Sequence, residues 1–290
     1  MINIYLDTNF ISELVKADRN LRNGVPNEQQ YQRWESLLNV LRIGVRRNVF
    51  ACPASQIQIE EAMVAGDSLL YDIYYLLKEL SLGLYFREWL QILDYQLVDG
   101  LHQHFGIAQD IETVWSPFTN DRPSVTEKRT TQKIRENMAN YNAPSPKASF
   151  SEQYQAERNS FLQILKADRL HQIHTGIQMH GANKKGLSYI ESFFNSPNID
   201  SVPFIHIFCS MFASFRFHEP GRTFKKGNEY ADVLALSCTL PYCQIVTTDA
   251  NMKTNAVNRL KLDKMYNVSL YSPRDISNLV RALYRELIRI

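Results

Sequence analysis

The sequence predicts an α/β protein with a short parallel sheet and a large helical insertion. Four short apolar runs bounded by polar or turn residues lie near the two ends of the chain, at residues 2–6, 49–52, 244–248 and 268–271. Such runs are typical of buried parallel strands. The long middle of the chain is helical in pattern, and we expect no strand in it. We therefore assign residues 1–65 and 229–290 to one α/β domain and residues 66–228 to an all-helical insertion.

The remaining elements of the α/β domain are predicted to be helices. Residues 28–47, 56–65 and 68–82 carry apolar side chains at helical spacing. The last helix has a clear start, because Ser272 can cap it and Pro273 occupies its first position.

Composition sets limits on the partner and the compartment. The chain has 290 residues, of which 44% are apolar and 21% charged, and a net charge of only +2. Any basic surface for a nucleic acid must therefore be local. The four cysteines form no CxxC pair and sit in apolar surroundings, so we expect buried free thiols. No signal peptide or membrane segment is expected, and a cytoplasmic location fits.

Acidic residues follow the predicted strands or open a helix: Asp7, Glu60, Glu61, Asp232 and Asp249. The carboxyl ends of parallel strands share one edge of a sheet, where sites gather. Acids collected there repel one another unless a cation neutralises them, and Mg²⁺ suits oxygen ligands. This pattern predicts a divalent-metal site, with phosphate chemistry as the leading hypothesis.

Each acid also has a purely structural interpretation. Asp7 could cap the helix that follows it, and Asp249 could cap a turn. One of Glu60 and Glu61 is expected on a solvated helix face. A shared site explains these acids better than four independent caps or surface acids that happen to occur in this order.

Three segments resemble the motifs of PIN-domain ribonucleases. Residues 6–14 (LDTNFISEL) are similar to the opening motif, and residues 231–249 (ADVLALSCTLPYCQIVTTD) to the closing half. Residues 55–61 (SQIQIEE) match the family's segment of a serine followed by a glutamate. The resemblance covers about the first 65 and the last 60 residues. The large insertion departs from the short members of the family.

The resemblance implies a three-layer α/β/α sandwich, one or two Mg²⁺ or Mn²⁺ ions, and hydrolysis of phosphodiester bonds, usually in RNA. Carried over by position, it implies four catalytic acids: Asp7, Glu61, Asp232 and Asp249. Asp7, Asp232 and Asp249 are the expected metal ligands. Glu61 is preferred to Glu60 because it lies six residues after Ser55. Asn9 and Thr247 match polar positions that orient these acids.

Other residues extend the predicted site. Glu229 lies three residues before Asp232, on the same helix face. Three basic residues just before that helix are expected to contact substrate phosphates: Arg222, Lys225 and Lys226.

The expected function is thus a metal-dependent endoribonuclease acting on single-stranded or loop RNA, in the manner of a toxin or defence effector. An inhibitory protein partner and a homo-oligomer are compatible with it. Two alternatives stay open: a flap-type, structure-selective DNA nuclease, and a non-catalytic PIN-like scaffold.

Overall fold

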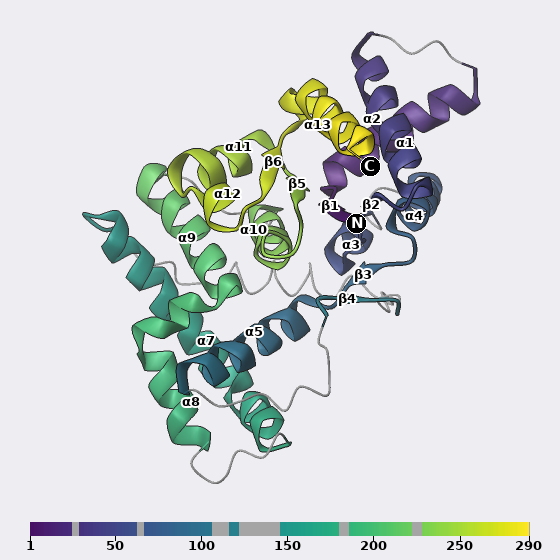
Figure 1. Ribbon diagram of the computed structural model, residues 1–290. Helices are drawn as coiled ribbons and strands as arrows, with labels where there is room; N and C mark the ends of the chain where they lie inside the picture. Colours follow the sequence, from purple (N-terminus) through teal and green to yellow (C-terminus); the bar gives the residue numbers. More distant parts are fainter. Residues whose placement is uncertain are drawn as a thin grey trace.

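The chain is mostly helical around a small parallel sheet, which is compatible with the α/β class (Figure 1). The computed structural model describes residues 1–24, 29–62, 67–105, 116–121, 146–179, 186–221 and 228–289. The sheet has the strand order β2-β1-β5-β6. Its strands are β1 (Ile2–Tyr5), β2 (Phe50–Ala51), β5 (Ile245–Thr247) and β6 (Ser269–Tyr271). Each lies within one of the four predicted apolar runs.

Strand β1 lies in the middle of the sheet, between β2 from the N-terminal part of the chain and β5 from the C-terminal part. It pairs in parallel with β2 through Ile2 and Phe50, and with β5 through Ile4 and Ile245. β6 continues the sheet beyond β5. All four strands run in the same direction, so their carboxyl ends share one edge of the sheet.

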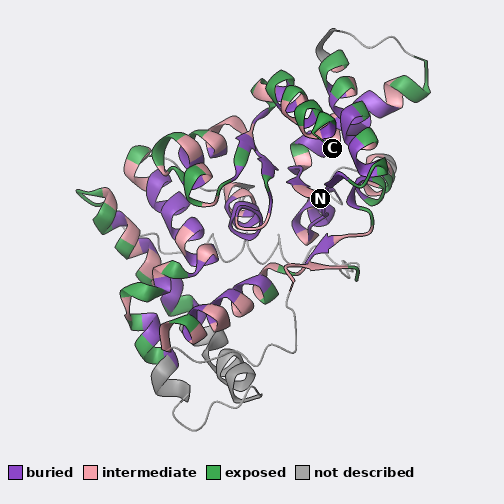
Figure 2. Cartoon of the chain, viewed as in Figure 1, coloured by how far each residue is buried: buried purple, intermediate pink, exposed green. Residues whose placement is uncertain are grey.

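Helices cover both faces of the sheet because successive residues of a strand point to opposite sides. Ile4 and Leu6 enter one core with α1 (Thr8–Arg22), α2 (Gln29–Arg46), α4 (Asp67–Ser81) and α13 (Ile276–Ile288). Tyr5 enters the other core with α5 (Trp89–Phe105), α9 (Pro203–His218) and α10 (Asn228–Thr239). In Figure 2 the buried residues run along the sheet and the helix faces turned toward it.

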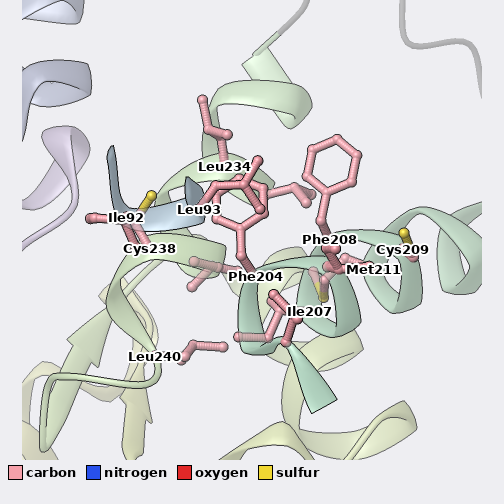
Figure 3. Packing of buried hydrophobic residues seen from close by; sticks show 14 of the residues in the cluster. Ile92, Leu93, Phe204, Ile207, Phe208, Cys209, Met211, Leu234, Cys238 and Leu240 are labelled. Atoms are coloured by element: carbon pink, nitrogen blue, oxygen red, sulfur yellow. The ribbon is translucent and has the colours of Figure 1, made fainter. Parts of the chain in front are cut away.

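The second core is built largely around α9. Its Phe204 and Phe208 pack with Ile92 of α5 and Leu234 of α10 (Figure 3). The rings of Phe204 and Phe208 are stacked, with centroids 6.0 Å apart. Because α9 packs directly on α10, the expected insertion contributes to the surroundings of the helix that carries Asp232.

Other helices lie in the described part of the chain. They are α3 (Gln56–Ala62), α7 (Phe150–Met179), α8 (Gly186–Asn195), α11 (Ala250–Lys253) and α12 (Leu262–Met265). Shorter turns are η1 (Pro197–Ser201), the π-helical η2 (Thr254–Arg259) and η3 (Pro273–Asp275). The predicted start of the last helix is confirmed, with Ser272 and Asp275 forming a capping box. It begins as the 3₁₀ turn η3 before α13 continues.

The prediction of an all-helical insertion is wrong. Strand β3 (Tyr85–Phe86) pairs antiparallel with β4 (Phe118–Thr119), and Tyr85 also bridges to Ala54. Strands of two residues are too short to show an alternating pattern in the sequence. Tertiary contacts stabilise them instead: the ring centroid of Phe86 lies 4.9 Å from that of Phe118 and 6.1 Å from that of Tyr5.

Two further expectations concern side chains and membranes. All four cysteines are buried and free, as predicted: Cys52, Cys209, Cys238 and Cys243. Among the helices that the structure describes, none is long and apolar enough to span a bilayer.

Candidate active site

Asp7 lies where β1 gives way to α1, at the carboxyl edge of the sheet. Its side chain makes no capping hydrogen bond to α1, so the cap interpretation fails for this residue. Its backbone N–H donates to the Thr247 hydroxyl at 2.8 Å, and its Oδ2 accepts from Asn9 Nδ2 at 3.3 Å. Both orienting residues expected from the sequence, Asn9 and Thr247, therefore contact Asp7.

Asp249 follows β5 and does cap a helix. Its Oδ1 accepts hydrogen bonds from the backbone N–H groups of Asn251 at 2.6 Å and Met252 at 2.8 Å, at the start of α11. The interpretation of Asp249 as a cap is therefore correct. The cap engages one carboxylate oxygen and fixes the orientation of the group beside the end of β5.

The two neighbouring glutamates of α3 have different surroundings. Glu60 is buried and accepts a hydrogen bond from Gln56 Nε2 at 2.9 Å. Glu61 accepts a hydrogen bond from the hydroxyl of Thr8, the residue that follows Asp7. The structure thus brings Glu61, rather than Glu60, to Asp7.

Asp232 lies in the second turn of α10, and the charges of four other acids act on its carboxyl. Burial raises its pKa to about 9. Four acids add to this rise: Asp7, Glu61, Asp249 and Glu229. Burial likewise raises the pKa of Asp7 to about 7, with the charge of Glu61 next in importance and that of Asp249 also contributing. Four acids from four separate segments of the chain therefore lie within electrostatic range of Asp232.

These acids suit a hard divalent cation in type, because carboxylate oxygens are the ligands that Mg²⁺ and Mn²⁺ accept. In the described part of the chain, no three Asp, Glu, His or Cys side chains are arranged closely enough to hold one ion. Like charges repel, so a closer approach of these carboxylates requires a cation between them.

This chain matches no protein-family model, no curated protein and no solved structure. The likeness to PIN-domain ribonucleases therefore rests on the sequence motifs.

Two site neighbours were missed by the sequence reasoning. Thr8 lies inside the opening motif, yet its contact with Glu61 is tertiary and leaves no mark in the sequence. Gln58 was recognisable, because a serine followed three residues later by a glutamine is a capping-box pattern. The box is present: Ser55 Oγ accepts from the Gln58 N–H at 3.3 Å, and Gln58 Oε1 accepts from the Ser55 N–H at 2.6 Å.

The three basic residues expected to bind substrate lie outside the described residues: Arg222, Lys225 and Lys226. Glu229 is described, one turn before Asp232 on α10, and its charge acts on Asp232.

Proposed function

We propose that this chain is a metal-dependent, PIN-like nuclease that hydrolyses RNA phosphodiester bonds with Mg²⁺ or Mn²⁺. The observation that carries the proposal is the position of Asp232. The charges of four other acids raise the pKa of this half-buried carboxyl, and three of these acids come from other segments of the chain. Burying like charges together is energetically unfavourable. Such a group of acids is therefore expected where a function requires it.

The sheet supports the PIN-like part of the proposal. Asp7 and Asp249 follow the adjacent parallel strands β1 and β5, and Glu61 lies on the helix after β2. Helices pack on both faces of this sheet, as a three-layer sandwich requires. The motifs that suggested the family are thus located on neighbouring elements.

In this proposal Asp7, Asp232 and Asp249 hold the ion. When bound, the ion lowers the pKa of a water molecule and neutralises charge on the phosphoryl oxygens. Asn9 and Thr247 hold Asp7 in place through its Oδ2 and its backbone N–H. Asp7 is buried and Asp232 half-buried, and the lower local dielectric strengthens the interaction of their carboxylates with a cation.

Glu61 and Glu229 extend the negative charge around these ligands. The Thr8 hydroxyl donates to Glu61, which fixes the direction of one carboxylate oxygen. The Asp249 cap leaves its carboxylate with one oxygen engaged by α11.

Cleavage of a labelled single-stranded RNA, and of a DNA with the same base sequence, tests the proposal. Each substrate is incubated with Mg²⁺, Mn²⁺ or EDTA. We expect cleavage of RNA that EDTA abolishes, and a loss of about 100-fold or more in Asp232→Asn, since a bound metal contributes several kcal/mol and 1.4 kcal/mol is tenfold.

Glu60→Gln is the matched control, because Glu60 is a buried acid adjacent to Glu61 but is engaged by Gln56. It should retain activity within a few-fold of wild type. Cleavage that persists in EDTA, or that is equal in wild type and Asp232→Asn, contradicts the proposal. Cleavage of DNA in preference to RNA would place the chain with the flap-type nucleases instead.

A further inference from the structure

Gln58 is a buried amide that joins the start of α3 to the end of β1. It is only 1% exposed. Its Nε2 donates a hydrogen bond to the carbonyl oxygen of Leu6, and its Oε1 accepts from the Ser55 N–H at 2.6 Å. One side chain thus links the residue before Asp7 to the residue that precedes α3.

A second link lies on the other side of Asp7. Thr8 donates its hydroxyl hydrogen bond to Glu61, which is three residues beyond Gln58 on α3. Residues three apart lie on the same face of a helix. The helix is therefore attached to the chain both immediately before and immediately after Asp7.

The amide of Gln58 supplies both the donor and the acceptor that its two contacts require. The Leu6 carbonyl needs a donor, and the Ser55 N–H needs an acceptor. A glutamate would lose the donor and add a negative charge beside the acids. A methionine would have nearly the same length but would leave both backbone groups without this partner, at a cost because the region is buried.

Asp7 and Glu61 carry like charges, so without a cation they tend to move apart. We propose that Gln58 is a positioning residue that keeps Asp7 and Glu61 together in readiness for the metal. Its effect on catalysis rests on the proposed nuclease function. Its effect on the relative placement of the two acids does not.

Gln58→Met tests this inference, with Gln96→Met as the matched control. Gln96 is also buried, donates to the Tyr242 hydroxyl at 2.7 Å and accepts from the Phe204 N–H at 2.7 Å. Tyr242 lies beside Asn3 in β1, near the opposite edge of the sheet from Asp7. Both variants remove an amide that bridges two partners, but of the two amides it is that of Gln58 which is bonded to the residue before Asp7.

Four quantities are measured for each variant: the melting temperature, the affinity for Mn²⁺, and kcat and KM for RNA cleavage. We expect similar falls in melting temperature. Only Gln58→Met should weaken Mn²⁺ binding, by about 10- to 100-fold, as loss of a residue that orients metal ligands does. Its kcat should fall while KM changes little. Wild-type Mn²⁺ affinity in Gln58→Met, or an equal loss in Gln96→Met, overturns the inference.

A second measurement needs neither metal nor activity. In EDTA, Asp7→Asn relieves repulsion and should raise the denaturation midpoint in the wild-type background. In the Gln58→Met background the rise should be smaller, because Asp7 and Glu61 are then free to separate. Equal rises in the two backgrounds refute the positioning role. Should Gln58→Met fail to fold, Gln58→Asn, which is too short to reach both partners, replaces it in the same cycle.

The two proposals can fail separately. A wild-type protein that neither binds Mn²⁺ nor cleaves RNA refutes the nuclease function, whereas the double-mutant cycle in EDTA still decides whether Gln58 holds the acids together.

Discussion

The backbone N–H of Asp7 donates a hydrogen bond to the Thr247 hydroxyl at 2.8 Å, across 240 residues of chain. The bond joins the end of β1 to the end of β5. Since Asp249 follows Thr247 by two residues, the same contact fixes the two acids relative to each other. The candidate site therefore depends on the sheet for its assembly.

We predict that the metal-free protein loses stability as pH rises from 5 to 9. The pKa of Asp7 is raised to about 7 and that of Asp232 to about 9, from an ordinary value of 3.8. Between these values the folded state keeps protons that the unfolded chain releases, so the free energy of unfolding falls with pH through both values. Urea denaturation in EDTA at pH 5, 7 and 9 measures this. Asp232→Asn should flatten the dependence, and an equally steep dependence in that variant would show that other groups cause it.

Added Mn²⁺ should raise the melting temperature of wild type more than that of Asp249→Asn. Binding to the folded state stabilises it by mass action, and the variant loses a ligand charge. Asparagine is as good an N-cap as aspartate, so α11 should keep its start. Thermal denaturation with and without Mn²⁺ gives the two shifts. Equal shifts would indicate that the ion binds elsewhere.

Asp7→Asn and Asp18→Asn should change stability in opposite directions. In EDTA at pH 8, Asp7→Asn removes a buried charge that Glu61 repels, and we expect a gain on the order of 2 kcal/mol, below the roughly 4 kcal/mol that its full pKa rise represents. Asp18 is instead paired with Arg42 and Arg22, both at 2.8 Å. Its replacement should cost on the order of 1–3 kcal/mol, because the buried Asp18 loses its charged hydrogen bond with the half-buried Arg42 as well as its contact with the exposed Arg22. Chemical denaturation measures both, and destabilisation by Asp7→Asn would contradict the repulsion described here.

Gly44→Ala should destabilise the protein although the glycine lies inside α2. Alanine normally favours a helix over glycine by about 1 kcal/mol. Here a Cβ atom would lie 1.9 Å from Cδ2 of the buried Phe50 ring in β2. Overpacking of this kind costs about 1–3 kcal/mol, so we expect a net loss in denaturation experiments. Gly100→Ala is the control: its Cβ would meet the tip of the Phe193 ring at 2.9 Å, and the loss should be smaller.

The sequence was sufficient for the four strands of the sheet because each is a short apolar run with a polar boundary. It was insufficient for β3 and β4, whose pairing depends on contacts such as that between Phe86 and Phe118. The choice between Glu60 and Glu61 shows the same limit. Both are acids on one short helix, and tertiary and local contacts such as those with the hydroxyl of Thr8 and the amide of Gln56 distinguish their surroundings.

The cap at Asp249 shows why two interpretations of one residue need not compete. Asparagine or aspartate at this position could be explained by α11 alone, and the sequence could not exclude that reading. The structure places the same carboxylate within range of Asp232, which a cap does not require. Gln58, in contrast, follows a capping-box pattern in the sequence. Its hydrogen bond to the Leu6 carbonyl is a tertiary contact that this pattern does not predict.

The central position of β1 has a consequence for biosynthesis. Its partner β5 is made only after some 240 further residues, which at 5–20 residues per second takes on the order of tens of seconds. Asp7 and Glu61 are made early, whereas Asp232 and Asp249 follow within the last 60 residues of the sequence. The candidate site can therefore assemble only after most of the chain has been made, so the acids come together late in synthesis or after it.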